Sequence, residues 1–238
     1  MSVHVKIPAM RSLPLLFLQL FLAILFCSLQ LGNSSSCAQS TATLKLCSET
    51  LHKNRRKIME SKSPNTQSLF PTLDPTYQKL KQTYSDWEEC VKGQKAPLQS
   101  FKTINGETYD AASLEGKIVV VNFWFMSCAP CRAEIPALNK LVEEYKGKNV
   151  LFIGFSTDKA DRLKSAFFEQ NRFDFKVVAD AQSLARSFQV MSFPTTFVID
   201  QEGVIRQAWI GVDSSLGALN PYYKAKAAID NLLVTATK

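Results

Sequence analysis

The stretch IVVVNFWFMSCAPCRAEIP, residues 118–136, contains the features that decide the fold of this chain. Its first eight residues, 118–125, are almost all β-branched or aromatic, which is typical of a strand buried on both faces of a sheet. Apolar residues then recur at helical spacing over residues 130–146, which predicts a helix directly after the strand. Cys128 and Cys131 therefore stand where a buried strand passes into a helix.

The spacing of Cys128 and Cys131 points to thiol chemistry. Two intervening residues bring both sulfurs within bonding reach in one helical turn, and Pro130 stiffens that turn. Unpaired backbone N–H groups and the helix dipole at the start of a helix favour a thiolate at the first cysteine. We therefore expect Cys128 to attack a disulfide, and Cys131 to resolve the mixed disulfide that results.

Other uses of a C-x-x-C pair lack their remaining residues in this sequence. The chain has no second C-x-x-C pair and no histidine after His52, so a four-ligand zinc site would be incomplete and we expect no metal. A Cys-His hydrolase lacks its histidine base for the same reason. A thiol peroxidase stays an alternative because it needs one reactive thiolate at a helix start, although residues 122–127 lack a proline and threonine scaffold.

Further strands and helices are predicted around this junction. Strands are expected at 150–155, 176–179, 195–199 and 204–210, helices at 158–170, 181–188 and from Pro221 with Asn220 as its cap, and a short hairpin at 101–109. Strand and helix alternate at first, and the last two strands form an antiparallel hairpin before the closing helix. The expected fold is α/β, with a central mixed β-sheet flanked by helices on both faces.

Residues 39–95 are polar, rich in lysine and interrupted by prolines, and we expect an extension or linker rather than part of a core. Within it, residues 75–91 show one apolar face at helical spacing, with Asp74 as N-cap and Pro75 in the first turn. A basic cluster at 53–57 is interpreted as a solvated helix face. No nucleic-acid motif accompanies it, and no nucleic-acid partner is expected.

Cys47 and Cys90 both lie in this extension. In an oxidising compartment they can form a structural disulfide that ties the extension together. Unpaired thiols or an auxiliary redox couple are the alternatives, and the sequence leaves all three open.

The N-terminus has the features of a secretory signal peptide over residues 1–38. Basic residues precede an apolar run, and a small-residue cleavage site ends at Ala38. The mature chain would carry 26 basic and 21 acidic residues, a net charge of +5, and would be a soluble periplasmic or otherwise exported protein. An uncleaved membrane anchor over 13–31 is the alternative, whereas a lipoprotein is disfavoured because neither Cys27 nor Cys37 has a convincing lipobox before it.

Several motifs occur together in the C-terminal part: VNFW at 121–124, the cysteine pair, Glu134, Pro136, and FPTTFVID at 193–200. In combination they resemble the thioredoxin superfamily, specifically its exported TlpA/ResA-like branch, over about residues 96–238. The resemblance implies a thioredoxin-like fold and a thiol-disulfide oxidoreductase that needs no cofactor. It also implies that Pro194 follows a cis peptide bond facing the disulfide, and that Phe193, Pro194 and Trp124 contact the substrate.

Two positions bear on the acid–base chemistry of the cysteines. Asn122 stands where cytoplasmic thioredoxins have a buried aspartate that helps the resolving cysteine ionise. Glu134 matches a glutamate of the ResA-like branch and lies three residues after Cys131, so the two side chains share a helix face. We expect Glu134 to replace the missing aspartate, the alternative being a solvated surface carboxylate. Pro136 matches a family proline that kinks the helix and is expected to act in packing.

The expected activity is the reduction of disulfides in exported proteins, with apocytochrome c among the substrates that the family suggests. A membrane thiol-disulfide carrier would return electrons to the cysteine pair. A net thiol oxidase is an alternative because Ala129-Pro130 between the cysteines does not fix the redox potential. A peptide-binding redox module and a thiol peroxidase of the AhpC/TSA type are further alternatives, and membrane contact is expected only if the N-terminal segment is retained.

Overall fold

The computed structural model describes residues 43–61, 74–163, 165–211, 217 and 219–235. The predicted signal peptide and the alternative membrane anchor lie outside these ranges. Residues 42–238 group into one compact unit. None of the helices in the described ranges is both long and apolar enough to span a membrane.

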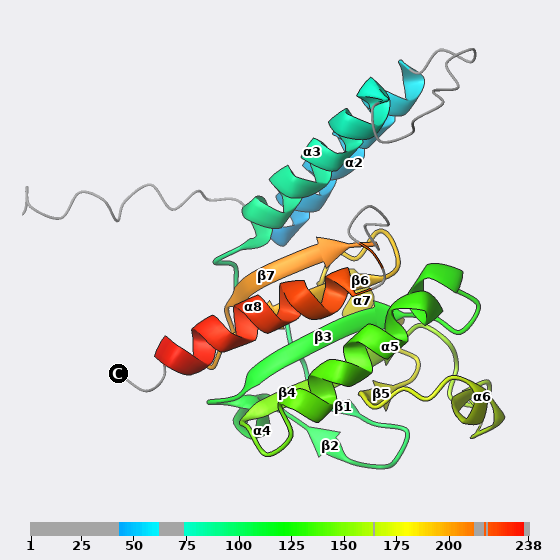
Figure 1. The fold of residues 1–238 in the computed structure, drawn as a ribbon, viewed down its shortest axis with the longest axis vertical. Coiled ribbons are helices and arrows are strands. Elements are labelled where there is room, and N and C mark those ends of the chain that lie inside the picture. The colour runs from blue at the N-terminus through cyan, green and yellow to red at the C-terminus, as the bar shows by residue number, and fades with distance from the viewer. Residues whose placement is uncertain (1–42, 62–73, 164, 212–216, 218, 236–238) are drawn as a thin grey trace, which may run out of the picture. The chain divides into compact units, whose positions relative to one another are not determined.

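A five-stranded mixed sheet forms the centre of this unit (Figure 1). Its strands are β3 (Ile118–Trp124), β4 (Val150–Ser156), β5 (Lys176–Val178), β6 (Thr195–Ile199) and β7 (Ile205–Ile210). In the order β5-β4-β3-β6-β7, the first three strands are parallel and the last two pair antiparallel with their neighbours. The bounds agree with the predicted strands to within one residue, and the expected mixed sheet is confirmed.

Helices cover both faces of the sheet. They are α4 (Ala111–Leu114), α5 (Ala129–Glu144), α6 (Ser165–Gln170), α7 (Gln182–Ser187) and α8 (Asn220–Thr235), and a small hairpin joins β1 (Phe101–Lys102) to β2 (Thr108–Tyr109). α5 and α8 lie side by side over one face (Figure 1). α7 packs on the other face, so the prediction of helices on both faces is confirmed.

Alternating side chains of β3 divide the interior into two buried clusters. All seven residues of the strand are buried, as its continuous apolar run predicts. Val119, Val121 and Phe123 enter a cluster with α7, whereas Ile118 and Trp124 enter a second cluster with α5 and α8. Because the two faces of one strand serve two clusters, β3 fixes the position of the α5 start relative to the rest of the sheet.

The predicted helix over 158–170 is wrong in its first half. α6 begins at Ser165, and the segment before it forms turns and bends. Asp158 does not cap a helix, because its carboxylate accepts hydrogen bonds from the Met126 N–H at 2.6 Å and the Ser156 hydroxyl at 3.0 Å. These contacts hold the segment against the loop that follows β3, and local periodicity carries no information about them.

Two further helices, α2 (Leu44–Glu60) and α3 (Pro75–Val91), precede the sheet in the sequence and lie side by side (Figure 1). α3 has the bounds that its apolar periodicity predicts. The sequence predicts a helix face at 53–57 but not the bounds of α2, because few residues of this helix are buried. A disulfide joins Cys47 of α2 to Cys90 of α3, which is the first of the three arrangements that the sequence leaves open.

The α2–α3 pair shares a core with the sheet, so this part of the chain is more than the extension or linker that its composition predicts. Cys47, Leu51, Trp87 and Val91 belong to the same buried cluster as residues of β3, β6 and β7. The ring of Trp87 meets that of Phe197 edge-on, with 5.9 Å between their centroids. Composition misses this packing because a few large side chains are enough to attach two otherwise polar helices.

Arg55 corrects the interpretation of the basic cluster as a wholly solvated face. Its Nη1 atom donates a hydrogen bond to the Ser192 hydroxyl at 3.1 Å, and its guanidinium carbon lies 5.5 Å from the centroid of the Tyr84 ring. The hydroxyl of Ser48 donates to the Gln189 carbonyl at 3.1 Å. The lysines and the second arginine of the cluster are exposed, as expected. α2 therefore contacts the loop that precedes β6.

Candidate functional site

Cys128 and Cys131 lie at the start of α5, directly after β3, and are joined by a disulfide. Cys128 is the N-cap residue of the helix, and the backbone N–H of Cys131 donates a hydrogen bond to its Sγ atom at 3.2 Å. A helix N-terminus with an N–H directed at the sulfur favours the thiolate once the disulfide is reduced. The side chain of Cys128 is 5% exposed and that of Cys131 is 1% exposed. This geometry favours Cys128 as the attacking thiol.

The loop between β3 and α5 is held from both sides. Met126 donates its N–H to Asp158, and its carbonyl oxygen accepts a hydrogen bond from Arg132 Nη1 at 3.0 Å. Pro130 lies in the first turn of α5, where its missing N–H costs no hydrogen bond. Cys128 is therefore presented on a fixed turn. Motif spacing did not reveal Asp158 or Arg132, because their contacts are tertiary.

The peptide bond between Phe193 and Pro194 is cis, as the resemblance implies. Pro194 is buried, and its carbonyl accepts a hydrogen bond from the Gly211 N–H at 2.8 Å. Phe193 is half-buried; its ring meets that of Phe125 edge-on at 5.3 Å and packs against the cluster that contains both active-site cysteines. Among the described residues, none makes a hydrogen bond with the backbone N–H or carbonyl of Phe193. Such groups can pair with an extended peptide.

Glu134 is buried next to Asn122 and is not the solvated carboxylate that was the alternative. It is 0% exposed, and its Oε1 atom accepts a hydrogen bond from Asn122 Nδ2 at 2.7 Å. Asn122 Nδ2 also donates to the Thr196 hydroxyl at 3.0 Å. Within the described residues, Glu134 Oε2 has no hydrogen-bond partner. Asn122 therefore anchors the carboxyl group instead of acting as an acid itself.

The surroundings of Glu134 change its protonation. Burial raises its pKa from about 4.5 to about 8, and the hydrogen bond from Asn122 opposes this only in part. The group is thus mostly protonated at neutral pH and can both give and take a proton near pH 8. Glu134 and Cys131 are both buried on α5, one helical turn apart.

Trp124 occupies a different environment from the one expected for a substrate contact. Its side chain is 1% exposed, stacks on Phe167 at 5.7 Å between centroids, and meets Phe173 edge-on at 5.3 Å. The ring therefore fills the space between β3 and the α6 region. A direct contact of Trp124 with substrate stays a prediction that its position does not support.

Metal binding has no visible basis at this site. In the part of the chain that the structure describes, no cluster of three or more His, Cys, Asp or Glu side chains is placed to hold an ion. The two active-site sulfurs are bonded to each other, and the neighbouring carboxyl group of Glu134 is engaged by Asn122.

Comparison with known proteins agrees with the site. A family model described as the AhpC/TSA family matches residues 92–208. The thioredoxin-like protein YneN of Bacillus subtilis (strain 168) is 38% identical over 135 residues, which cover 56% of this chain and 79% of YneN. The thiol-disulfide oxidoreductase ResA of Bacillus anthracis is 33% identical over 129 residues, which cover 54% of this chain and 75% of ResA.

A solved structure supports the same assignment. The crystal structure of a thiol:disulfide interchange protein DsbE from Chlorobium tepidum is similar with a TM-score of 0.51 and 26% identity, covering 58% of this chain and 97% of that one. The α2–α3 pair lies before residue 92 and so precedes the region matched by the family model. The shared sheet, the cysteine pair at the start of α5 and the cis-proline loop place this chain in the family of thioredoxin-like thiol-disulfide oxidoreductases to which YneN and ResA belong.

Proposed function

We propose that this protein reduces disulfide bonds in exported proteins. In the reduced enzyme, the Cys128 thiolate attacks one sulfur of a substrate disulfide, forms a mixed disulfide and releases the other sulfur as a thiolate. Cys131 then attacks the sulfur of Cys128, so the substrate leaves as a dithiol and the enzyme disulfide forms. Two electrons pass to the substrate, and a membrane thiol-disulfide carrier returns two electrons to the enzyme.

The hydrogen bond from the Cys131 N–H to Cys128 Sγ carries this proposal. It directs an unpaired N-terminal N–H group of α5 at the sulfur that must be a thiolate. The lower exposure of Cys131 suits a thiol that reacts only with a neighbour already bound to Cys128. The same turn thus supports attack by one sulfur and resolution by the other.

Glu134 is proposed as the proton carrier of the second step. Cys131 must lose its proton before it attacks Cys128, and the substrate sulfur that leaves must gain one. The carboxyl group of Glu134, with its pKa raised to about 8, accepts this proton in the molecules in which it is ionised, and their share grows as the pH approaches 8. Asn122 and Thr196 hold the carboxyl group in place for this transfer.

The proposed substrates are disulfide-containing proteins outside the cytoplasm, with apocytochrome c as one candidate. An extended substrate segment would pair with the backbone of Phe193 beside the cis-proline, where no described residue takes those hydrogen bonds. The names of the relatives, thiol-disulfide oxidoreductase and thiol:disulfide interchange protein, agree with exchange between proteins. We propose an exported, periplasmic location, with the N-terminal segment acting as signal peptide or anchor.

A redox titration of the Cys128/Cys131 pair against glutathione tests the direction of exchange. A potential near that of thioredoxin, about −270 mV, is expected for a reductase. A potential near that of a strong oxidant, about −120 mV, would contradict the proposal and favour the thiol oxidase. The Cys131→Ser variant adds a second test, since it is expected to trap substrates covalently through Cys128.

A thiol peroxidase is the second candidate, because the matching family model is described as AhpC/TSA. In that reaction the Cys128 thiolate takes one peroxide oxygen, becomes a sulfenic acid and releases water or an alcohol. The Cys131→Ser variant would then still consume one equivalent of hydrogen peroxide rapidly. We expect slow consumption by both proteins and rapid reduction of protein disulfides by the wild type; the reverse pattern would favour the peroxidase.

A further inference from the structure

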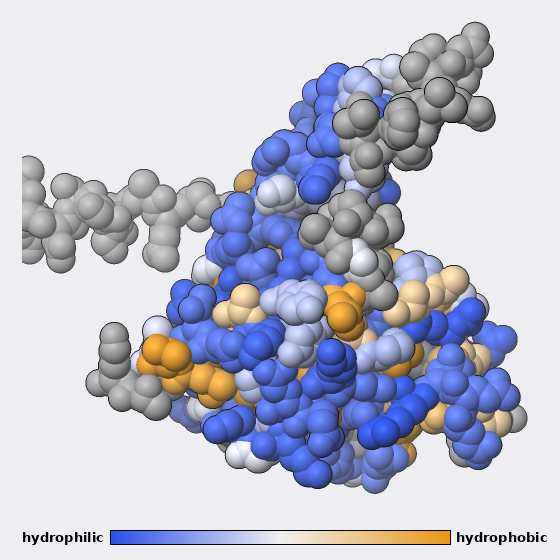
Figure 2. All heavy atoms as spheres, in the orientation of Figure 1, coloured by the Kyte–Doolittle hydropathy of each residue, from blue (hydrophilic) through white to orange (hydrophobic). Residues whose placement is uncertain are grey.

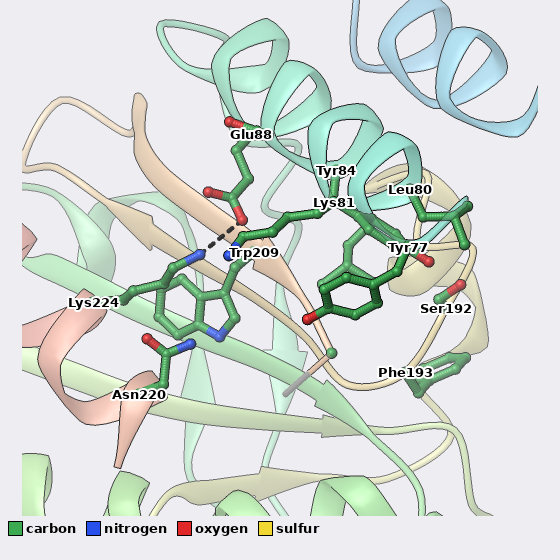
Figure 3. Close-up of a pocket in the computed structure, with 13 residues that line it drawn as sticks. Tyr77, Leu80, Lys81, Tyr84, Glu88, Ser192, Phe193, Trp209, Asn220 and Lys224 are labelled. Carbon is green, nitrogen blue, oxygen red and sulfur yellow. Dashed lines mark hydrogen bonds and ion pairs between the residues drawn. The ribbon is translucent and has the colours of Figure 1, made fainter. Parts of the chain in front are cut away.

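A cavity of about 500 Å³ lies between α3 on one side and β7 with the start of α8 on the other. Figure 3 shows side chains from all three elements and from the cis-proline loop around it. Its volume is in the range of cavities that take ligands. The region matched by the family model, residues 92–208, contains neither α3 nor α8, so the matched region alone would leave this cavity without two of its walls.

One end of the cavity lies beside Phe193, the residue before the cis-proline. Tyr77 and Leu80 of α3 face Ser192 and Phe193 there (Figure 3). Phe193 immediately precedes the cis-proline, and its ring contacts Phe125 in the loop before the cysteine pair. A substrate segment that lies along Phe193 while its sulfur reacts therefore has the cavity next to its path.

The chemistry of the cavity is mainly apolar and aromatic. Its walls include Tyr77, Leu80, Tyr84, Phe193, Trp209 and Ile210. Three charged side chains also line the cavity (Figure 3). At the far end, Lys224 forms an ion pair with Glu88 at 2.8 Å and lies over the Trp209 ring at 6.0 Å, and Lys81 of α3 adds a positive charge. Such a lining suits a large apolar or aromatic side chain better than a charged group.

Figure 2 shows the hydropathy of one face of the molecule. That face is mostly hydrophilic, with small and separate apolar patches. Three of the exposed large apolar side chains lie next to residues of the cavity in the sequence: Met191 before Ser192, and Leu219 and Tyr223 at the start of α8. The others in the described chain are Leu46, Met59, Ile104 and Val234. A substrate side chain that seeks apolar contacts beside Phe193 finds them in the cavity.

The α3 wall is fixed before any substrate arrives. The Cys47–Cys90 disulfide ties α3 to α2, and Trp87 anchors α3 in the core. Arg55 of α2 connects the α3 wall to the cis-proline loop, because it bonds to Ser192 in that loop and lies over the Tyr84 ring of α3. A preformed wall lowers the ordering cost of binding.

We infer that this cavity binds a large apolar or aromatic side chain of the substrate polypeptide, a few residues from the cysteine that Cys128 attacks. The α2–α3 pair is then a substrate-selecting element. This inference rests on the proposed function, since its occupant is the disulfide-bearing chain itself. In an extended segment, alternate side chains point to the same side, so a segment paired with Phe193 can direct one of them into the cavity.

Two synthetic peptides test this inference with the Cys131→Ser protein. Each has one cysteine blocked as a mixed disulfide with thionitrobenzoate; one has phenylalanine three residues before and after the cysteine, and the other has serine there. Cys128 bonds to the peptide sulfur and the thionitrobenzoate leaves with the electron pair of the broken bond, so its absorbance reports the rate. We expect the phenylalanine peptide to react about tenfold faster, the gain from burying one aromatic side chain.

A double variant in α3, Tyr77→Ser with Leu80→Ser, is expected to bring the ratio of the two rates close to one. The matched control Lys79→Ala changes an exposed residue of the same helix that does not line the cavity, and it is expected to keep the wild-type ratio. The comparison of the two peptides with the Cys131→Ser protein itself leaves the cavity residues unchanged, so it does not depend on how the α3 variants fold.

The outcomes separate this inference from the proposed function. Rapid but equal reaction with both peptides would overturn the inference alone. If the protein released thionitrobenzoate from both peptides no faster than free glutathione does, the exchange function on which the inference rests would be contradicted. A ratio that falls as protein concentration rises, together with sedimentation as a dimer, would assign the cavity to a second copy of the chain and would also overturn the inference.

Discussion

The two disulfides in the described part of the chain have opposite surroundings. Cys128 caps the start of α5 and receives the N–H of Cys131, whereas Cys90 lies in the last turn of α3, where backbone carbonyls disfavour an anion. Cys47 is 1% exposed within an apolar cluster, which also disfavours a thiolate. Cys47 lies in the first turn of α2, so helix position alone does not separate the two disulfides. The Cys128–Cys131 pair differs in that Cys128 is the N-cap and the N–H of Cys131 is directed at its sulfur.

The largest expected difference is in the exchange reaction itself. Replacing the attacking thiol, Cys128→Ser, is expected to reduce exchange with a small aromatic disulfide to the uncatalysed rate. The double replacement Cys47→Ser with Cys90→Ser leaves the α5 turn intact and is expected to retain the reaction. Stopped-flow measurement of thiol release checks both; exchange that depends on Cys90 would break the distinction between the two disulfides.

The second prediction concerns stability. The Cys47–Cys90 bond closes 43 residues, and its loss is expected to lower the free energy of unfolding by about 4 kcal/mol through the greater freedom of the unfolded chain. Urea unfolding of the oxidised wild type and of the double serine variant measures this. Loss of less than about 1 kcal/mol would show that the α2–α3 pair is held without its disulfide.

The third prediction concerns proton transfer by Glu134 when Cys131 attacks Cys128. Glu134→Gln is expected to slow the resolution step about 100-fold and to remove an inflection near pH 8 from its pH profile. Rapid-mixing measurement of the second step follows the effect, and Glu143→Gln, an exposed carboxylate of the same helix, is the matched control. An unchanged pH profile would show that Glu134 does not transfer the proton and contributes only to packing.

Glu134 also has a signature in stability. Its pKa is raised on folding, so the wild type is most stable, relative to Glu134→Gln, below about pH 4.5 and loses that advantage as pH rises to about 8. The loss is expected to be a few kcal/mol, since each pKa unit corresponds to about 1.4 kcal/mol. Parallel stability curves of the two proteins between these pH values would contradict the burial of an ionisable carboxyl group.

The smallest expected effect concerns the contact between α2 and the cis-proline loop. Arg55→Ala removes a hydrogen bond to Ser192 and the contact with the Tyr84 ring, and it is expected to cost about 1–2 kcal/mol of unfolding free energy. Lys53→Ala, an exposed neighbour on the same helix, is expected to change stability by less than about 0.5 kcal/mol. Equal effects of the two changes would show that Arg55 is no better engaged than its neighbours.

The local parts of the site were predictable, and the tertiary parts were not. The run 118–125 and the spacing of the cysteines indicate a strand, a turn and a helix because each signal lies within a few residues. The sequence left open whether Glu134 is an acid–base group beside Cys131 or a solvated carboxylate. Its burial depends on a hydrogen bond from Asn122, which joins α5 to β3 and is not visible in local sequence patterns. The sequence predicts a helix that begins at Asp158, whereas in the structure Asp158 accepts a hydrogen bond from the Met126 N–H and lies outside any helix.

The same reason explains the N-terminal part. α3 was predictable because its apolar face and its Asp74 cap occur together in the sequence. α2 was not, since its attachment depends on partners far along the chain, among them Gln189 and Ser192. Polar composition correctly indicates helices with solvated faces and misses that both contribute to the core of the sheet.

Differential reduction of the two disulfides tests the central claim most directly. Oxidised protein is equilibrated in glutathione buffers of decreasing potential, alkylated at each step and mapped by mass spectrometry. We expect Cys128 and Cys131 to become alkylated together while Cys47 and Cys90 stay joined, because structural disulfides in exported proteins resist reduction down to about −300 mV. Reduction of the Cys47–Cys90 bond at or before the potential at which Cys128–Cys131 opens would contradict the account.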